Sequence, residues 1–357
     1  LHTLFPYTTL FRSSQYADSI REGKKGAEDR DFEVIGQTFH KWVMENKSLM
    51  GLNKNTDFEK FILKEFKIFV NVYIRLKEFS QNFNKEYEYV FYNADRGFTF
   101  QYQMILASIC TDDTLDIINK KIKLVTCFID QFIAVRVFNF KTLDYSSIRY
   151  TIFNLTKKIR RKTIDELVKI FQGYIKDMGL TLENIDNFYL NQFTARYMLH
   201  ILSRITYYLE DNSGINSSFY NYVNRQQKNP YDIEHIWAND YIQGNHQSEF
   251  LTEEEFSSFR NRFGGLLILP KDKNRSIQDM EYVNKSGKYD SENLLVRTLN
   301  GNCYGNNPLF LSFIKNNGLN FKPYIQFDKA NLIERQHLYK EICKIIWNTD
   351  LFQIIVQ

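Results

Sequence analysis

A short stretch that joins an acidic residue to a histidine constrains the fold of this chain most. The run from Tyr231 to Trp237 has a β-like pattern and carries Glu234 next to His235. A second β-like run, Leu266 to Leu269, is followed by a polar helix, expected over Asp272 to about Lys288, that contains Asn274 near its start. The pattern therefore predicts two short strands and a helix start, with a carboxylate, an imidazole and an amide near their junction.

The rest of the chain has helical patterns. From Asp57 onward, apolar residues recur every three or four positions, as expected for one face of a helix. Further helices are expected over Gln101 to Cys110, Ile117 to Phe138, Ser147 to Ile159 and Ile185 to Glu210. The stripe from Asp57 comprises Phe58, Phe61, Ile62, Phe66, Phe69, Val70, Tyr73 and Ile74, and the inward face of the second helix comprises Ile118, Ile122, Val125, Ile129 and Ile133.

Local signals also predict where one helix starts and stops. Thr163 with Glu166 has the spacing of a capping box, and Gly179 is a suitable C-terminal stop. The basic run from Lys157 to Lys162 fits either a solvated helix end or a phosphate contact. We expect a hinge between two domains around residues 178–187.

These patterns predict a mainly α protein with a small α+β unit, in which a helical body is followed by a ββα unit embedded in helices. A length of 357 residues allows two domains. We expect a helical middle domain over residues 15–182 and a catalytic domain over residues 183–357. Residues 1–14 are expected to be an artefact, because Thr3 to Ser13 matches the translation of a common sequencing adaptor.

The composition limits the environment and the partners. No uncharged apolar run reaches the roughly 18 residues that a membrane span needs, so we expect no membrane association. The four cysteines are dispersed without a C-x-x-C pair, which suits a reducing cytoplasm. A net charge of +4 is compatible with a polyanionic partner but is not evidence for one.

The residues near the strand junction suit phosphodiester hydrolysis. That reaction needs an activated water and a cation to neutralise the developing charge. Imidazole has a pKa near neutrality, so His235 is the candidate general base. The oxygens of Glu234 and Asn274 are candidate ligands for one Mg²⁺ or Mn²⁺ ion. Each residue alone would be an ordinary surface or capping group, and only their joint occurrence points to a site.

Three segments resemble a known family. They are Asp232 to Ile236, Asn261 to Leu269 and Lys273 to Arg275. They look like the C-terminal HNH nuclease domain of GmrSD-like, modification-dependent restriction enzymes. The helix Asn191 to Glu210, the closing helix Ile333 to Trp347 and the body from about Trp42 are also similar to that family. From this resemblance we expect that the family's N-terminal ParB-like nucleotide-binding domain is missing from the sequence.

The resemblance implies a function and a set of roles. It implies a metal-dependent DNA endonuclease of bacterial restriction or anti-phage defence, which acts on modified phage DNA selected by the N-terminal domain. His235 would be the base, and Glu234 and Asn274 the metal ligands. The expected supporting residues are Asp232, Asn261 and Gly265, and the expected DNA-binding residues are Arg275, Lys285 and Lys288.

Two departures from the family pattern leave alternatives open. Gly265 replaces the middle asparagine of the H-N-H set, and Ala238 replaces a proline. Asn261, further upstream, could partly substitute for the missing amide. A catalytically impaired adaptor that retains DNA binding, and an HNH-type ribonuclease, are therefore the competing interpretations.

Overall fold

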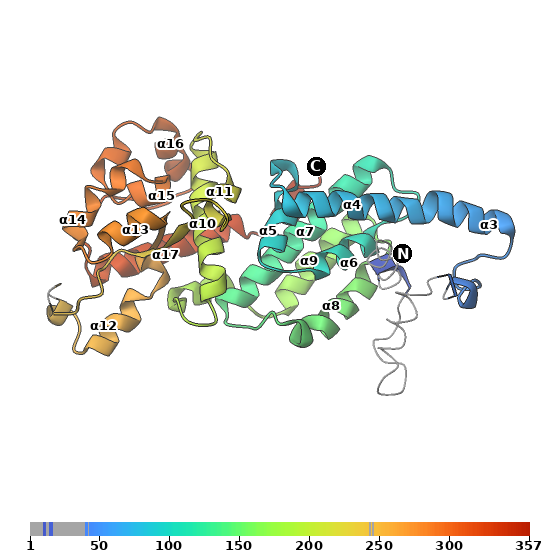
Figure 1. Ribbon diagram of the computed structural model, residues 1–357, viewed down its shortest axis with the longest axis horizontal. Coiled ribbons are helices and arrows are strands. Elements are labelled where there is room, and N and C mark those ends of the chain that lie inside the picture. The colour runs from blue at the N-terminus through green and yellow to red at the C-terminus, as the bar shows by residue number, and fades with distance from the viewer. Residues whose placement is uncertain (1–9, 12–13, 17–39, 42, 243, 245) are drawn as a thin grey trace. The chain divides into compact units, whose positions relative to one another are not determined.

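The structure, a computed structural model, describes residues 10–11, 14–16, 40–41, 43–242, 244 and 246–357. Within these residues the chain is mainly helical, with one two-stranded antiparallel sheet (Figure 1). The predicted combination of a mainly α chain with a small β component is therefore confirmed. Most of the N-terminal segment assigned to an adaptor, and Trp42, lie outside the described residues. Of the part that is described, Phe11 is buried and packs against Phe61.

The chain forms two compact units. The helical unit comprises Leu1–Ile133, Thr142–Gly179 and Thr349–Gln357, and the mixed unit comprises Ala134–Lys141 and Leu180–Asn348. The division of the chain into functional domains at residue 182 stays a prediction. No helix in the described part of the chain is both long enough and apolar enough to cross a membrane.

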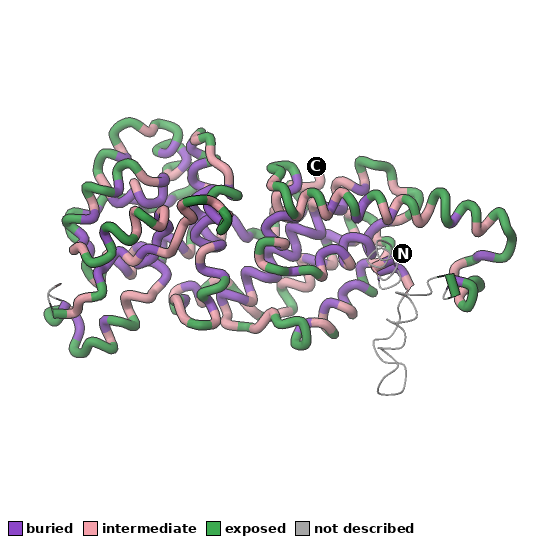
Figure 2. Tube along the Cα trace, in the orientation of Figure 1, coloured by how far each residue is buried: buried purple, intermediate pink, exposed green. Residues whose placement is uncertain are grey.

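The helical unit contains α7 (Leu115–Phe138) as far as Ile133, and the five predicted inward residues of this helix are all buried (Figure 2). The predicted capping box of Thr163 and Glu166 opens α9, and Gly179 follows that helix with a φ of +61°. The elements of this unit besides α7 are α3 (Asn55–Lys60), α4 (Lys67–Gln81), α5 (Glu88–Asp95), α6 (Phe100–Ser108), α8 (Tyr145–Ile159), α9 (Ile164–Asp177) and α18 (Leu351–Ile354).

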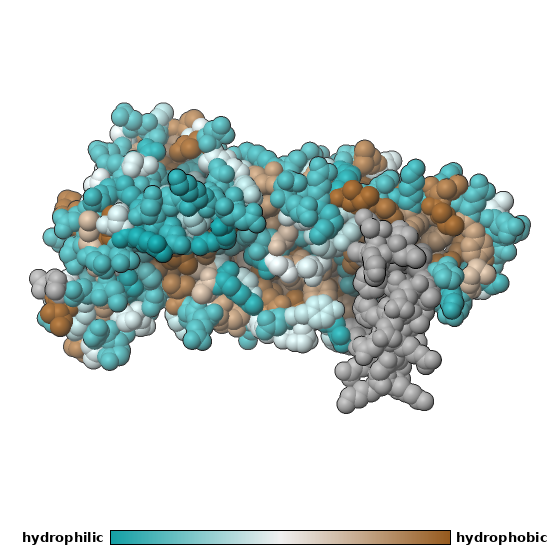
Figure 3. Space-filling model, in the orientation of Figure 1, coloured by the Kyte–Doolittle hydropathy of each residue, from teal (hydrophilic) through white to brown (hydrophobic). Residues whose placement is uncertain are grey.

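The apolar stripe expected from Asp57 is only partly right. A π-helical segment, Phe61–Phe66, joins α3 to α4 and adds a residue to the turn. This changes which positions share a face, so Ile62 and Ile74 are 58% and 50% exposed although the pattern placed them inside. Apolar side chains accordingly reach the surface of the helical unit (Figure 3).

The mixed unit contains the sheet. Strand β1 (Tyr231–His235) pairs with β2 (Leu266–Pro270) from Tyr231 opposite Pro270 to His235 opposite Leu266. Helices α10 and α15 contact the sheet, and α17 contacts the turn Phe263–Gly265 before β2. The helices of this unit are α10 (Ala195–Asn212), α11 (Phe219–Val223), α12 (Glu253–Arg260), α13 (Lys271–Ile277), α14 (Tyr282–Ser286), α15 (Leu294–Arg297), α16 (Pro308–Asn316) and α17 (Lys329–Ile346).

Two helices expected here are shorter than predicted. The helix expected over Ile185 to Glu210 is a 3₁₀ segment, Leu182–Asn187, followed after a break by α10. The helix expected over Asp272 to Lys288 is divided into α13 and α14. Ile277 and Tyr282 are both buried, and five positions on a continuous helix lie about 140° apart. The break lets both side chains face the core.

Candidate active site

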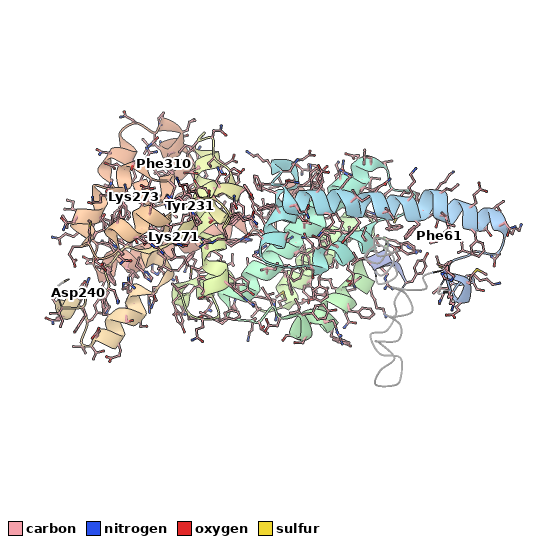
Figure 4. All side chains as sticks on the ribbon, viewed as in Figure 1. Phe61, Tyr231, Asp240, Lys271, Lys273 and Phe310 are labelled. Carbon is pink, nitrogen blue, oxygen red and sulfur yellow. The ribbon has the colours of Figure 1, made fainter. Side chains whose placement is uncertain are left out.

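Glu234 and His235 are the last two residues of β1, where they point to opposite faces of the sheet. Figure 4 labels Tyr231 at the start of this strand, and Lys271 and Lys273 where α13 follows β2. The two candidate residues therefore have separate surroundings, although they are adjacent in the chain.

On one face, Glu234 forms a buried ion pair. Its side chain is 2% exposed, and Oε1 accepts hydrogen bonds from Lys285 Nζ at 2.7 Å and from the Tyr289 hydroxyl at 3.2 Å. Lys285 Nζ also donates to the His235 carbonyl at 2.8 Å. Burial raises the pKa of Glu234, and the nearby Lys285 ammonium opposes that shift. The ion pair holds the carboxylate in one place, next to the main-chain carbonyl of His235.

On the other face, an amide fixes the imidazole of His235. His235 Nε2 lies 2.9 Å from Asn261 Oδ1, and Asn261 Nδ2 donates to the Ser257 carbonyl at 3.0 Å. The second bond identifies Oδ1 as the acceptor, so Nε2 carries the proton and the lone pair remains on Nδ1. Burial lowers the pKa of His235 to about 4, and the charge of Arg260 adds to this effect. The ring is therefore neutral near pH 7 and able to accept a proton at Nδ1.

Asn274 connects α13 to β1. Its Nδ2 donates to the carbonyl of Ile233 at 2.9 Å, directly before Glu234 in the chain. Within the described residues, Asn274 Oδ1 and Glu234 Oε2 accept no hydrogen bond from the protein. Two oxygens without protein partners, one of them anionic, fit the preference of Mg²⁺ for oxygen ligands. Lys285 competes only for the other carboxylate oxygen.

The segment that carries this geometry resembles a known protein family. Residues 176–340 match the family model of the GmrSD restriction endonucleases, C-terminal domain. This region is similar to the GmrSD C-terminal domain. It contains both strands and the candidate residues described above, and the match supports a nuclease activity for it. Neither a curated protein nor a solved structure matches the chain.

The three basic residues expected to bind DNA differ in how far they are exposed. Arg275 and Lys288 are exposed. Lys285 is fully buried against Glu234, so its ammonium is not presented to solvent, and this position does not fit a direct phosphate contact. Asp232 accepts a hydrogen bond from Arg225 at 2.7 Å, and this contact ties down the start of β1.

The turn before β2 contains Gly265, where the family pattern has an asparagine. A Cβ atom at Gly264 would lie 2.4 Å from the Gln336 main-chain nitrogen, so only glycine fits. At Gly265 a Cβ atom would lie 3.1 Å from Leu332 Cδ1 and 3.3 Å from the Arg260 carbonyl. An asparagine there would require the Leu332 side chain to move slightly, and the amide that contacts His235 comes from Asn261 instead.

The sequence interpretation did not identify two residues of the site. Tyr289 bonds Glu234, and Arg260 donates from Nε to the carbonyls of Trp237 and Ala238 at 3.1 and 3.2 Å. Both are brought to the strand by tertiary packing, and no local pattern marks them. Only the charge of Arg260, at the end of a helix that precedes β2, could have drawn attention to it.

A second group of ligand-type side chains lies in the helical unit. The ligand atoms of Cys110, Asp112 and Asp113 lie within 4.8 Å of one another. However, Asp113 Oδ2 already accepts from Lys121 Nζ at 2.6 Å and from the Cys110 main-chain nitrogen at 2.8 Å. This carboxylate is therefore neutralised by the protein, and the cluster is not assigned as a metal site.

Proposed function

We propose that this chain is a metal-dependent DNA endonuclease of the HNH (ββα-metal) type, with His235 as the general base. The observation that carries the proposal is the neutral, oriented imidazole of His235 beside Glu234 in a region similar to the GmrSD C-terminal domain. Strands β1 and β2 with helix α13 supply the two strands and the helix that such a site requires.

In this proposal each residue has one task. His235 Nδ1 takes a proton from the attacking water, while Asn261 holds Nε2 and so fixes the ring and its tautomer. Glu234 and Asn274 would hold Mg²⁺ or Mn²⁺, which supplies charge neutralisation at the phosphate and the leaving oxygen. Lys285 keeps the Glu234 carboxylate next to the main-chain carbonyl of His235.

The wider role follows from the family and is part of the proposal. The chain would act in the cytoplasm in bacterial restriction or phage defence. A ParB-like nucleotide-binding domain, as in the family's larger proteins, would select modified phage DNA. The exposed Arg275 and Lys288 are the proposed phosphate contacts on the nuclease side. The mostly hydrophilic face of the mixed unit drawn in Figure 3 is compatible with such a substrate.

One alternative has an observation in its favour. Gly265 stands where the family pattern has the middle asparagine, and Lys285 already neutralises part of the charge of the Glu234 carboxylate. A protein that binds DNA without cutting it would have both features. The alternative is an adaptor, and it requires no bound cation.

A plasmid-nicking assay with Mg²⁺ or Mn²⁺ tests the proposed function. His235→Ala should lower the rate by about 10²- to 10⁴-fold, which is the usual contribution of general base catalysis. His337→Ala is the matched control, because that histidine is 59% exposed and pairs with Asp186, away from the candidate residues in the chain. Equal rates for wild type and His235→Ala would remove His235 from the mechanism.

Calorimetric titration with Mn²⁺ separates the enzyme from the adaptor. The enzyme should bind the ion at a site that Glu234→Ala and Asn274→Ala abolish. An adaptor should show no site that depends on these two residues. Parallel nicking and RNA-cleavage assays would identify a ribonuclease, which would cut only the RNA.

A further inference from the structure

Arg260 is held in place against the segment that directly follows β1, the strand that carries the two candidate catalytic residues. It is the last residue of α12, and its Nε donates to the carbonyls of Trp237 and Ala238, just beyond the end of β1. Two hydrogen bonds from one nitrogen fix the plane of the guanidinium. The side chain is only partly exposed, which strengthens its electrostatic interactions.

The next residue in the chain contacts the imidazole. Asn261 follows Arg260 directly, and its Oδ1 lies 2.9 Å from His235 Nε2. Arg260 is therefore anchored to the segment that follows His235 and precedes the residue that orients the imidazole. No described residue of the protein bonds its two terminal nitrogens. A fixed, partly desolvated cation with two N–H groups to offer is suited to bind an anion.

We propose that Arg260 binds the phosphate that the water activated by His235 attacks. The inference rests on the proposed nuclease function. A guanidinium can donate two parallel hydrogen bonds to phosphate oxygens, and a pre-fixed one stabilises the charge that develops on them. Unlike Arg275 and Lys288, which are exposed, Arg260 acts at the reacting phosphate and not along the flanking backbone.

The competing explanation is that Arg260 only secures the chain after β1. Two substitutions distinguish these roles. In Arg260→Gln the amide nitrogen occupies the position of the arginine Nε, so the bonds to Trp237 and Ala238 can form while the charge and the terminal nitrogens are lost. Arg260→Met introduces a side chain about as long as that of glutamine and also removes the nitrogen that donates to Trp237 and Ala238. The phosphate role therefore predicts that Arg260→Gln is already defective.

The experiment combines DNA binding with cleavage on the full chain. Affinity for a DNA duplex is measured by fluorescence anisotropy in EDTA over a range of salt, and cleavage is measured with Mn²⁺. Arg260→Gln should weaken binding, reduce the salt slope by about one and slow cleavage by about 10²- to 10³-fold. Arg262→Gln is the matched control, because its guanidinium stacks on the Phe259 ring, 4.1 Å from the centroid.

The outcomes separate this proposal from the proposed function. If wild type cuts DNA and Arg260→Gln cuts equally fast, the phosphate role of Arg260 is overturned and the nuclease function stands. A defect in Arg260→Met alone also overturns it, in favour of a structural role. If wild type cuts neither DNA nor RNA but Arg260→Gln still loses affinity and salt slope, the nuclease function fails and a phosphate contact at Arg260 is supported.

Discussion

Two buried lysines, one in each unit, make nearly the same contacts. In the helical unit, Lys121 is 1% exposed, and its Nζ bonds Asp113 at 2.6 Å and a main-chain carbonyl at 2.8 Å. In the mixed unit, Lys285 is fully buried, and its Nζ bonds Glu234 at 2.7 Å and a main-chain carbonyl at 2.8 Å. The ion pairs alone do not distinguish a structural site from a functional one.

The difference lies around the carboxylates. Asp113 is 10% exposed and also accepts a main-chain hydrogen bond from Cys110, so its pair with Lys121 closes the loop before α7. Glu234 is more deeply buried and is followed by His235, whose ring is oriented by an amide. A buried lysine–carboxylate pair therefore indicates chemistry only when a proton acceptor is fixed beside it.

The largest expected difference between the two carboxylates is in catalysis. Glu234→Gln should slow DNA cleavage by about 10²- to 10³-fold, because the proposed cation loses its charged ligand. Asp113→Asn makes the same chemical change in the helical unit and should leave the rate near that of wild type. Nicking rates at saturating Mn²⁺ provide the measurement. A comparable loss in both variants would end the functional distinction between the pairs.

The second expected difference is in stability. Lys285→Met leaves a buried carboxylate without its partner and should lower the free energy of unfolding by about 3–5 kcal/mol. Lys121→Met should cost less, about 1–2 kcal/mol, because Asp113 reaches solvent and keeps its main-chain bond. Urea unfolding followed by circular dichroism measures both. A larger loss for Lys121→Met would reverse the comparison.

The residues of the site differ in how far the sequence predicts them. Glu234, His235 and Asn274 were predicted because strand and helix-start patterns are local and these residues stand at their ends. The contact of Asn261 with the imidazole and the burial of Lys285 depend on how α12 and α14 pack on the strand. Such packing is decided by contacts between distant segments, which periodicity does not record.

The fold shows the same limit. The long α7 was predicted with its buried face because a regular period continued over its length. The π-helical segment Phe61–Phe66 and the break between α13 and α14 were not predicted. In both places the tertiary core overrides a continuous helical period, so positions that share a face in the sequence pattern separate in the structure.

The smallest expected difference is in the response to acid. Burial lowers the pKa of His235 to about 4, against an ordinary value near 6.5, so the unfolded chain binds a proton in this range before the folded chain does. The contribution of His235 to stability is therefore complete above about pH 6.5 and is lost as the pH falls through about 4. With allowance for the partial exposure of the ring, the loss should be about 2 kcal/mol.

Urea unfolding in EDTA at several pH values measures this loss. Trp237 and Trp347 lie in the mixed unit, so their fluorescence in a Trp42→Phe background follows the unit that contains His235. The raised pKa of Glu234 changes the free energy of unfolding in the opposite direction as the pH falls. The decisive quantity is therefore the difference in free energy of unfolding between wild type and His235→Gln. That difference should shrink toward acid pH because His235→Gln has no imidazole to protonate. Asp113→Asn should keep the wild-type dependence of the free energy of unfolding on pH. If His235→Gln also kept it, the imidazole would not be desolvated by its site.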